Sequence, residues 1–306
     1  MYKIHCLNNI SKIGLGELTD QYELTDNIEE ADAILVRSAN MHEMELPASV
    51  KCVARAGAGV NNIPLEAYAE KGIPVFNTPG ANANAVKELV LCGMLIAARD
   101  VVGGIEWCKE NAADENIGKS AEKAKKAFAG GEIMGKTLGV IGLGAIGKLV
   151  VESAEALGMS VVGYDPYLDA EKAAAISANM KFTTDLNELL AASDYASIHV
   201  PALPSTIGMI NAEAIAAMKD GAVFLNFSRD TLVDAEAMAA GLASGKVRRY
   251  VTDFATPAVV AMPGAIVIPH LGASTAEAED NCATMAAQEV MAYLERGEKI
   301  HCVNMK

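Results

Sequence analysis

His270 has the setting of a side chain that transfers protons. It follows an apolar run at 265–269 and precedes the small residues of Leu-Gly-Ala-Ser, which places an imidazole at the end of a predicted strand. A catalytic histidine commonly donates a hydrogen bond to a carboxylate, which fixes its tautomer. Asp253 lies upstream, but residues 254–276 contain neither Asp nor Glu. The sequence therefore predicts an acid–base histidine and raises the question of what supports it.

A second group of residues has the spacing of a dinucleotide-binding loop. Gly142, Gly144 and Gly147 follow the apolar run at 137–141 and open a predicted helix, and Asp165 ends the next apolar run. The glycines allow a tight turn, close approach of a pyrophosphate and close helix packing. An acid at the end of this next strand hydrogen-bonds a ribose 2′-hydroxyl and repels a 2′-phosphate, so Asp165 favours NAD over NADP. The alternative is a glycine turn that serves packing alone.

Composition limits the class of protein. The 306 residues are 51% hydrophobic and 21% charged, with a net charge of −14. An acidic chain does not favour nucleic acid or an anionic membrane as a partner. The sequence has no signal-peptide pattern, and its longest apolar run is too short to span a membrane, so we expect a cytoplasmic protein. We expect no metal, since the six cysteines include no C-x-x-C pair.

Short apolar runs alternate with helical patterns through most of the chain, which predicts parallel sheets covered by helices. The predicted strands are 2–7, 33–38, 51–56, 74–78, 137–143, 160–165, 196–200, 222–227, 248–254 and 265–270. The predicted helices include 64–72, the very apolar 83–102 and the long amphipathic 278–299. Residues 110–136 are charged and rich in small residues, and we expect them to connect two domains.

The sequence resembles the D-isomer-specific 2-hydroxyacid dehydrogenases over nearly its whole length. Within this family it is most similar to the members that oxidise D-3-phosphoglycerate. The segments that carry the resemblance are ILVRS (34–38), ARAGAGVNNI (54–63), GIPVFNTPGANANAV (72–86), GKTLGVIGLGAIGK (135–148), GYDP (163–166), HVPALPST (199–206), NFSR (226–229), TDF (252–254) and PHLGAST (269–275).

The resemblance implies roles for individual residues. Arg229 and His270 match the catalytic arginine and the acid–base histidine, and both also bind the substrate. Ala58 and Gly59 match the loop that holds the substrate carboxylate. Arg55 ends the preceding predicted strand and is our candidate for binding the substrate phosphate, a salt bridge within the first domain being the alternative. Asp253 matches the contact to the nicotinamide carboxamide. The implied cofactor-binding residues are Thr78, Gly142, Gly144, Ala145, Ile146, Gly147, Asp165, His199, Val200, Pro201, Phe227, Ser228, Asp253, Gly272 and Ala273.

Three positions depart from the family pattern. The family carries D-V-F-x-x-E-P after its strand, and its Glu pairs with the histidine, whereas residues 253–258 here read DFATPA. Asp230 replaces the usual Gly after the arginine, and Asn61 replaces an Asp. Three interpretations stay open: His270 works unaided, Asp230 or a distant acid replaces the Glu, or the protein is a non-catalytic NAD-binding module like the C-terminal-binding corepressors.

We therefore predict an α/β protein of two doubly wound parallel-sheet domains with a cleft between them. A flavodoxin-like substrate domain spans 1–98 plus 283–306, and a Rossmann-type NAD domain spans 99–282. The predicted function is NAD-dependent oxidation of D-3-phosphoglycerate to 3-phosphohydroxypyruvate in serine biosynthesis. The alternative is a hydroxypyruvate or glyoxylate reductase or another D-2-hydroxyacid dehydrogenase. We expect no C-terminal regulatory domain, and a homodimer with helix 83–102 at its contact, burial within one subunit being the alternative.

Overall fold

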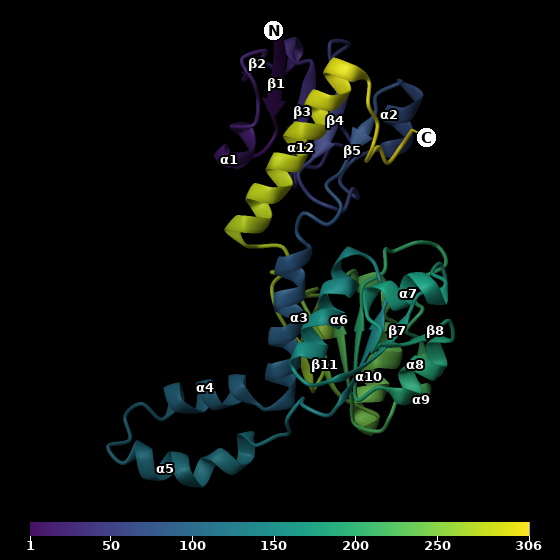
Figure 1. The fold of residues 1–306 in the computed structure, drawn as a ribbon. Coiled ribbons are helices and arrows are strands. Elements are labelled where there is room, and N and C mark those ends of the chain that lie inside the picture. The colour runs from purple at the N-terminus through teal and green to yellow at the C-terminus, as the bar shows by residue number, and fades with distance from the viewer. Residues whose placement is uncertain (306) are drawn as a thin grey trace. The chain divides into compact units, whose positions relative to one another are not determined.

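A computed structural model describes residues 1–305, which form two compact units (Figure 1). The first unit contains Met1–Ala85 and the residues from Ala273 on, and the second contains Val86–Gly272. Each unit is an α/β body around its own parallel sheet, so the predicted fold class is confirmed. The chain passes from one unit to the other near residues 85 and 272, whereas the boundaries predicted from the sequence follow residues 98 and 282.

The first unit has a five-stranded parallel sheet in the order β2-β1-β3-β4-β5. Its strands are β1 (Tyr2–Cys6), β2 (Tyr22–Leu24), β3 (Ala33–Val36), β4 (Cys52–Arg55) and β5 (Val75–Phe76). Every residue of the central strand β3 is buried, as expected for a parallel sheet covered on both faces. The sheet therefore places the ends of β3, β4 and β5 next to one another.

The long C-terminal helix returns to cover this first sheet. The helices of the unit are α1 (Lys12–Leu15), α2 (Leu65–Glu70) and α12 (Ala276–Arg296), with a 3₁₀ turn η1 (Ile28–Glu30). Figure 1 shows α12, in yellow, lying along β3 and β4. Its Ala283, Ala286 and Val290 pack with Ile4 and Leu35 in one buried cluster. The sequence-predicted helix 278–299 is thus confirmed as part of the first unit's core.

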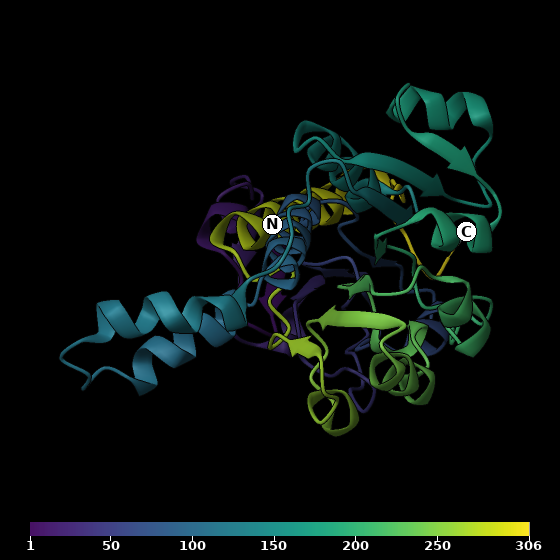
Figure 2. The same ribbon diagram turned by 90° about the horizontal axis from the view of Figure 1, so that it is seen from below.

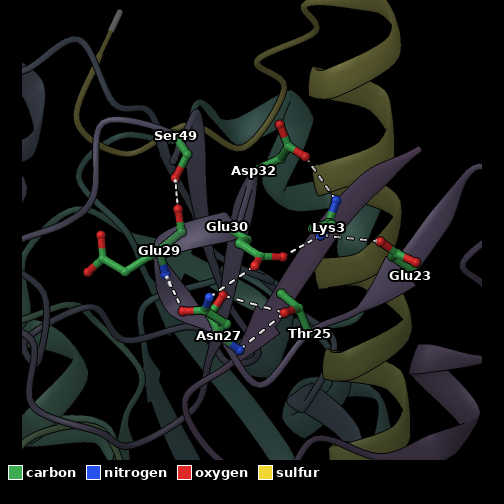
Figure 3. A network of polar contacts seen from close by, with 8 residues as sticks. All are labelled: Lys3, Glu23, Thr25, Asn27, Glu29, Glu30, Asp32 and Ser49. Atoms are coloured by element: carbon green, nitrogen blue, oxygen red, sulfur yellow. Dashed lines mark hydrogen bonds and ion pairs between the residues drawn. The ribbon is translucent and has the colours of Figure 1, made fainter.

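Polar contacts tie β1 to its neighbours at the edge of the first unit (Figure 3). The Lys3 N–H donates to Asp32 at 2.9 Å, and its ammonium pairs with Glu30 and, at 3.7 Å, with Glu23. The other residues of the network are Thr25, Asn27, Glu29 and Ser49. Exposed ion pairs of this kind contribute little to stability and weaken with salt. The network links β1 to β2 and to the segment between β2 and β3.

The second unit has a seven-stranded parallel sheet in the order β12-β11-β10-β9-β6-β7-β8. Its strands are β6 (Thr137–Ile141), β7 (Ser160–Tyr164), β8 (Lys181–Thr183), β9 (Tyr195–Ile198), β10 (Ala222–Asn226), β11 (Val247–Thr252) and β12 (Ala265–Val267). The strand order reverses between β6 and β9. In doubly wound sheets, ligands bind at the carboxyl ends of the strands at such a reversal.

Helices cover both faces of the second sheet. The covering helices are α3 (Ala83–Ala98), α6 (Ala145–Ala156), α7 (Ala170–Ile176), α8 (Leu186–Ala192), α9 (Ala212–Ala217), α10 (Ala235–Ser244) and α11 (Pro257–Val260). The unit also contains α4 (Val101–Glu110), α5 (Ile117–Ala124) and the 3₁₀ turns η2 (Lys125–Phe128) and η3 (Asp230–Leu232). Residues of α3, α6 and α7 share one buried cluster, and residues of α8 to α11 share another. This two-faced packing is the doubly wound arrangement that the sequence predicted.

The predicted helix 83–102 is two helices in the structure. Helix α3 ends at Ala98, and Asp100 caps α4 by accepting a hydrogen bond from the Gly103 N–H at 3.0 Å. Val90 and Met94 of α3 are buried in the cluster that contains Leu225 of the second sheet. The apolar character of α3 is therefore largely explained by burial within the subunit.

Residues 101–128, which we call the arm, extend away from the body of the second unit (Figures 1 and 2). The arm consists of α4, α5 and η2, and neither α4 nor α5 has a buried residue. Its base is closed by the Asp100 N–H, which donates to the Phe128 carbonyl at 3.2 Å. Trp107 contacts Phe128 with ring centroids 6.5 Å apart. The segment that the sequence assigned to a domain connection is thus mostly a helical projection.

Candidate active site

The glycine loop joins β6 to α6 at the reversal of the second sheet. Gly142 has φ 91°, and a Cβ there would lie 2.7 Å from the His199 carbonyl oxygen. A Cβ on Gly147 would lie 2.0 Å from the Gly142 carbonyl oxygen, so helix α6 can approach the loop only without that atom. A Cβ on Gly144 would have no atom within 4 Å. The open backbone at Gly144 and the uncapped start of α6 form a cradle for phosphate groups.

Asp165 stands directly after β7, beside the glycine loop. Its Oδ2 accepts a hydrogen bond from the Leu143 N–H at 3.1 Å, and its Oδ1 accepts one from the Tyr167 N–H at 3.0 Å. A carboxylate oxygen has two lone pairs, so both oxygens can accept a further hydrogen bond. The structure therefore places the sequence-predicted ribose acid next to the loop, where it also holds the backbone of Leu143.

His199 follows β9, the strand beside β6. Its N–H donates to the Ile141 carbonyl at 2.7 Å, and its Nε2 lies 2.9 Å from the Ser197 hydroxyl oxygen. Burial lowers the pKa of His199 to about 3, so the ring is neutral near pH 7. Val200 and Pro201 continue from His199 along the edge of the loop. A ring with so low a pKa is a poor proton acceptor, and the backbone N–H of His199 joins the end of β9 to β6 at the loop.

The end of β10 presents Arg229 through a braced loop. The Asn226 side chain is fully buried, and its Nδ2 donates to the Arg229 carbonyl at 2.8 Å. Its Oδ1 accepts from the Ser228 N–H at 3.1 Å. Ser228 in turn donates its hydroxyl to the Ile198 carbonyl at 2.8 Å, and Phe227 packs in the core. Sequence reasoning missed Asn226, because only the fold shows that its amide spans the turn.

Asp253 and His270 follow the two neighbouring strands β11 and β12. The Asp253 side chain is 1% exposed, whereas His270 is exposed and its ring contacts Phe254 edge-on at 5.2 Å. Burial raises the pKa of Asp253, and the Gly272 N–H and the charges of His270 and Arg229 oppose this rise. The carboxylate thus lies within electrostatic range of both an imidazole and a guanidinium at one edge of the sheet.

These side chains border a depression in the second unit. Its lining residues are Asp230, Asp253, Phe254, Ala255, Thr256, Pro269 and His270. A guanidinium, an imidazole and a carboxylate at one sheet edge can bind an anionic carbonyl compound and move a proton. Among residues 1–305 no group of three or more His, Cys, Asp or Glu side chains is arranged to hold a metal ion.

The first unit presents a smaller group of predicted site residues. Arg55 ends β4, and its Nε donates to the Arg37 carbonyl at 3.1 Å. A Cβ on Gly57 would lie 2.1 Å from the Arg55 Nη1, so the guanidinium packs against bare backbone. The Ala58 carbonyl accepts from the Asn77 side chain at 2.6 Å.

The remaining predicted residues of the first unit flank this loop. Gly59 continues it, and Thr78, which is fully buried, donates its N–H to the Gly57 carbonyl at 3.1 Å. Ala273 opens the segment that leads to α12. The predicted site residues therefore form one group in each unit.

The residues of the second unit fit a nicotinamide dinucleotide. The backbone at Gly144 leaves room for a pyrophosphate. Asp253 Oδ1 is buried and has no hydrogen-bond partner among the described residues, so it can accept from a carboxamide N–H. A bound group with phosphates at the loop and an amide donor at Asp253 would satisfy both features.

The chain belongs to the D-isomer-specific 2-hydroxyacid dehydrogenase family, and residues 91–272 match the NAD-binding domain of that family. The second unit is therefore an NAD-binding domain, as the glycine loop predicted. A D-3-phosphoglycerate dehydrogenase of Methanocaldococcus jannaschii is 36% identical over an alignment of 304 positions, which covers 96% of this chain and 56% of that protein. A hydroxypyruvate reductase of Thermotoga maritima is 38% identical over 86% of this chain and 85% of its own length.

Solved structures share the fold. The NAD⁺-bound 3-phosphoglycerate dehydrogenase of Entamoeba histolytica has a TM-score of 0.78 and 26% identity, with 99% of this chain and 98% of that chain covered. The chain spans about half the length of the curated relatives named D-3-phosphoglycerate dehydrogenase. No helix within residues 1–305 has the length and apolar character needed to cross a membrane.

Proposed function

We propose that this protein oxidises D-3-phosphoglycerate to 3-phosphohydroxypyruvate with NAD as the hydride acceptor. The observation that carries the proposal is the grouping of Arg229, Asp253 and His270 at the carboxyl ends of β10, β11 and β12. The relatives named D-3-phosphoglycerate dehydrogenase support the choice of substrate. We place the protein in the cytoplasm.

The chain's own residues have separate tasks in this reaction. Arg229 binds the substrate carboxylate and the oxygen on C2, where it stabilises the developing carbonyl. His270 accepts the proton of the C2 hydroxyl. NAD, when bound, takes the hydride from C2. The glycine loop would hold its pyrophosphate, Asp165 its ribose and Asp253 Oδ1 its carboxamide.

A second candidate function is the reduction of hydroxypyruvate or glyoxylate, because the Thermotoga maritima relative carries the name hydroxypyruvate reductase. The two activities differ in the phosphate on the substrate. Measuring kcat/KM for 3-phosphoglycerate, glycerate and lactate, and for hydroxypyruvate in the reverse direction, tests the proposal. A clear preference for an unphosphorylated substrate would replace the first proposal with the second.

Arg55→Ala is expected to lower kcat/KM for 3-phosphoglycerate about 10- to 100-fold, since a hydrogen bond to a charged group contributes about 1.5–3 kcal/mol. The value for glycerate is expected to stay close to wild type, because glycerate lacks the phosphate that we assign to Arg55. Steady-state kinetics with both substrates measure the difference.

Arg37→Ala is the matched control for this prediction. The Arg37 guanidinium already pairs with Glu279 at 2.7 Å, and its carbonyl, which holds Arg55, remains in the variant. Equal losses for both substrates in Arg55→Ala would assign Arg55 to the carboxylate common to them or to the fold.

Asp165→Asn is expected to reduce the preference for NAD over NADP by about tenfold or more. The change removes the charge that repels a 2′-phosphate, while the amide oxygen can still accept the Leu143 N–H. Calorimetry with both cofactors measures the preference. Tighter binding of NADP than NAD by the wild-type chain would contradict the role that we give Asp165.

We further propose that the protein is a homodimer through the outer face of α3 and the arm. Leu95 of α3 and Val101, Val102 and Ile105 of α4 are 42–50% exposed, which leaves apolar surface on the arm's helices. Sedimentation velocity at micromolar concentration measures the oligomeric state. A single monomeric species would contradict this part of the proposal.

A further inference from the structure

The backbone of His270 adopts a disfavoured conformation. Its φ is 47°, and within residues 1–305 it is the one non-glycine residue with a positive φ. An L-residue is disfavoured in the left-handed region because its Cβ crowds the neighbouring carbonyl oxygen. Such a conformation persists where the surrounding structure imposes it, and it is concentrated at active sites. The contacts of the turn at His270 should therefore show what imposes it.

Asp253 holds this turn on both sides of the histidine. Its carbonyl oxygen accepts the His270 N–H at 2.9 Å, and its carboxylate Oδ2 accepts the Gly272 N–H at 2.8 Å. Asp253 is itself fixed, since it directly follows β11, whose Thr252 pairs with Val267 of β12. One residue on the neighbouring strand thus fixes the two amides that flank Leu271.

A hydrogen bond to the turn does not by itself require a charged side chain at position 253. An uncharged side chain could accept the Gly272 N–H, yet a carboxylate is buried here although burial disfavours its charge. Its titration is influenced by His270 and Arg229, the two residues that we assign to catalysis. A buried negative charge at this place can support the imidazole when it accepts a proton.

The competing carboxylate is Asp230, which borders the same depression. It is exposed and begins the turn η3, where its carbonyl accepts the Val233 N–H at 3.2 Å. The His270 N–H also donates to the Ile268 carbonyl at 3.0 Å, and the two hydrogen bonds that join the 270–272 turn to the end of β11 are accepted by Asp253. The geometry therefore favours Asp253 over Asp230 as the support of His270.

We propose that Asp253 is the positioning residue of His270: its carbonyl oxygen and its Oδ2 hold the turn 270–272 in the conformation that presents the imidazole to the substrate. Asp253 is the Asp of the family pattern, so this support of the turn is present here although the Glu of the pattern is missing. It adds to the carboxamide contact assigned to Oδ1. The inference rests on the proposed function, because it takes His270 as the proton acceptor.

Amide hydrogen exchange of the full chain, measured by NMR without substrate or cofactor, tests the positioning directly. In Asp253→Ala the Gly272 amide loses its acceptor, and its exchange is expected to accelerate about tenfold or more, with the His270 amide following as the turn is released. Asp253→Asn keeps an oxygen for the Gly272 N–H, so both amides are expected to stay protected. Asp220→Ala, a change at a 92%-exposed side chain in the same unit, is the matched control.

Kinetics at saturating NAD provide the second readout. Asp253→Ala is expected to lower kcat about 100-fold, the loss that a displaced catalytic group can cause, with little change in KM for the hydroxy acid because Arg229 still binds it. Asp253→Asn is expected to recover part of this kcat because it restores the turn without the charge. A loss confined to KM for NAD would assign Asp253 to the cofactor alone.

Unchanged exchange at both amides in Asp253→Ala would overturn the proposal, even if kcat fell. Accelerated exchange in Asp253→Ala but not in Asp253→Asn, together with the kcat loss and its partial recovery, would support it. If the wild-type chain oxidises none of the hydroxy acids, the proposed function fails. The exchange data would still decide whether Asp253 holds the turn, so the two failures can be told apart.

Discussion

Replacing His270 with asparagine is expected to lower kcat for 3-phosphoglycerate at least about 100-fold, the loss typical of a missing general acid–base group. Asparagine tolerates a positive φ better than most residues, so the turn should keep its conformation. The NAD affinity is expected to stay close to wild type, since the glycine loop and Asp165 are untouched. Steady-state kinetics and calorimetry measure the two quantities.

His270→Ala extends this prediction. Alanine removes the imidazole but fits the left-handed turn less well than asparagine. A larger loss of kcat than in His270→Asn would therefore show the contribution of the turn's conformation. His5→Ala is the matched control, because His5 lies on β1 of the first unit, where its Nδ1 is 2.9 Å from the Thr25 carbonyl oxygen. Full activity in both His270 variants would exclude His270 as the proton acceptor. A wild-type chain that binds NAD but oxidises none of the hydroxy acids would favour the alternative of a non-catalytic NAD-binding module.

Arg229→Gln is expected to lower kcat/KM about 1,000-fold. The change removes the planar cation that binds the carboxylate in a bidentate manner and stabilises charge on the C2 oxygen, and losing one such donor costs about 10²–10³ in kcat alone. KM for the hydroxy acid is expected to rise as well, because the same guanidinium holds the ground-state carboxylate. Steady-state kinetics with 3-phosphoglycerate and glycerate measure both effects.

Arg229→Lys separates charge from shape. Lysine supplies the charge as a point and cannot form the paired hydrogen bonds, so most of the loss should remain. Arg249→Gln on β11 is the matched control, since its guanidinium donates to the Arg248 carbonyl away from the site. Activity of Arg229→Gln close to wild type would contradict the placement of the substrate at Arg229. The loss should appear with both substrates, unlike that of Arg55→Ala.

Most of the secondary structure could be predicted from local patterns. The apolar runs that became β3, β6, β9 and β10 are buried on both faces, and such runs are readable without knowledge of their neighbours. The three-residue edge strands β2 and β8 were missed, because strands that are partly exposed and this short have no apolar run to mark them. The glycine loop was predictable for the same local reason, since each glycine meets a constraint set by a few neighbouring residues.

The sequence by itself determined the two sheets, the dinucleotide loop and His270 as a candidate, because motif chemistry depends on residue types at fixed local spacing. The family resemblance added Arg229 as a candidate. Only the tertiary structure decided how these candidates are held. Asn226 braces Arg229, and Asp253 reaches the amides of His270 and Gly272 from another strand. The physical reason is that parallel pairing, with Thr252 opposite Val267, brings together strand ends that lie fifteen residues apart in the chain. The sequence named Asp253 but gave it only the carboxamide contact, because its contacts with the His270 turn depend on the register of β11 and β12.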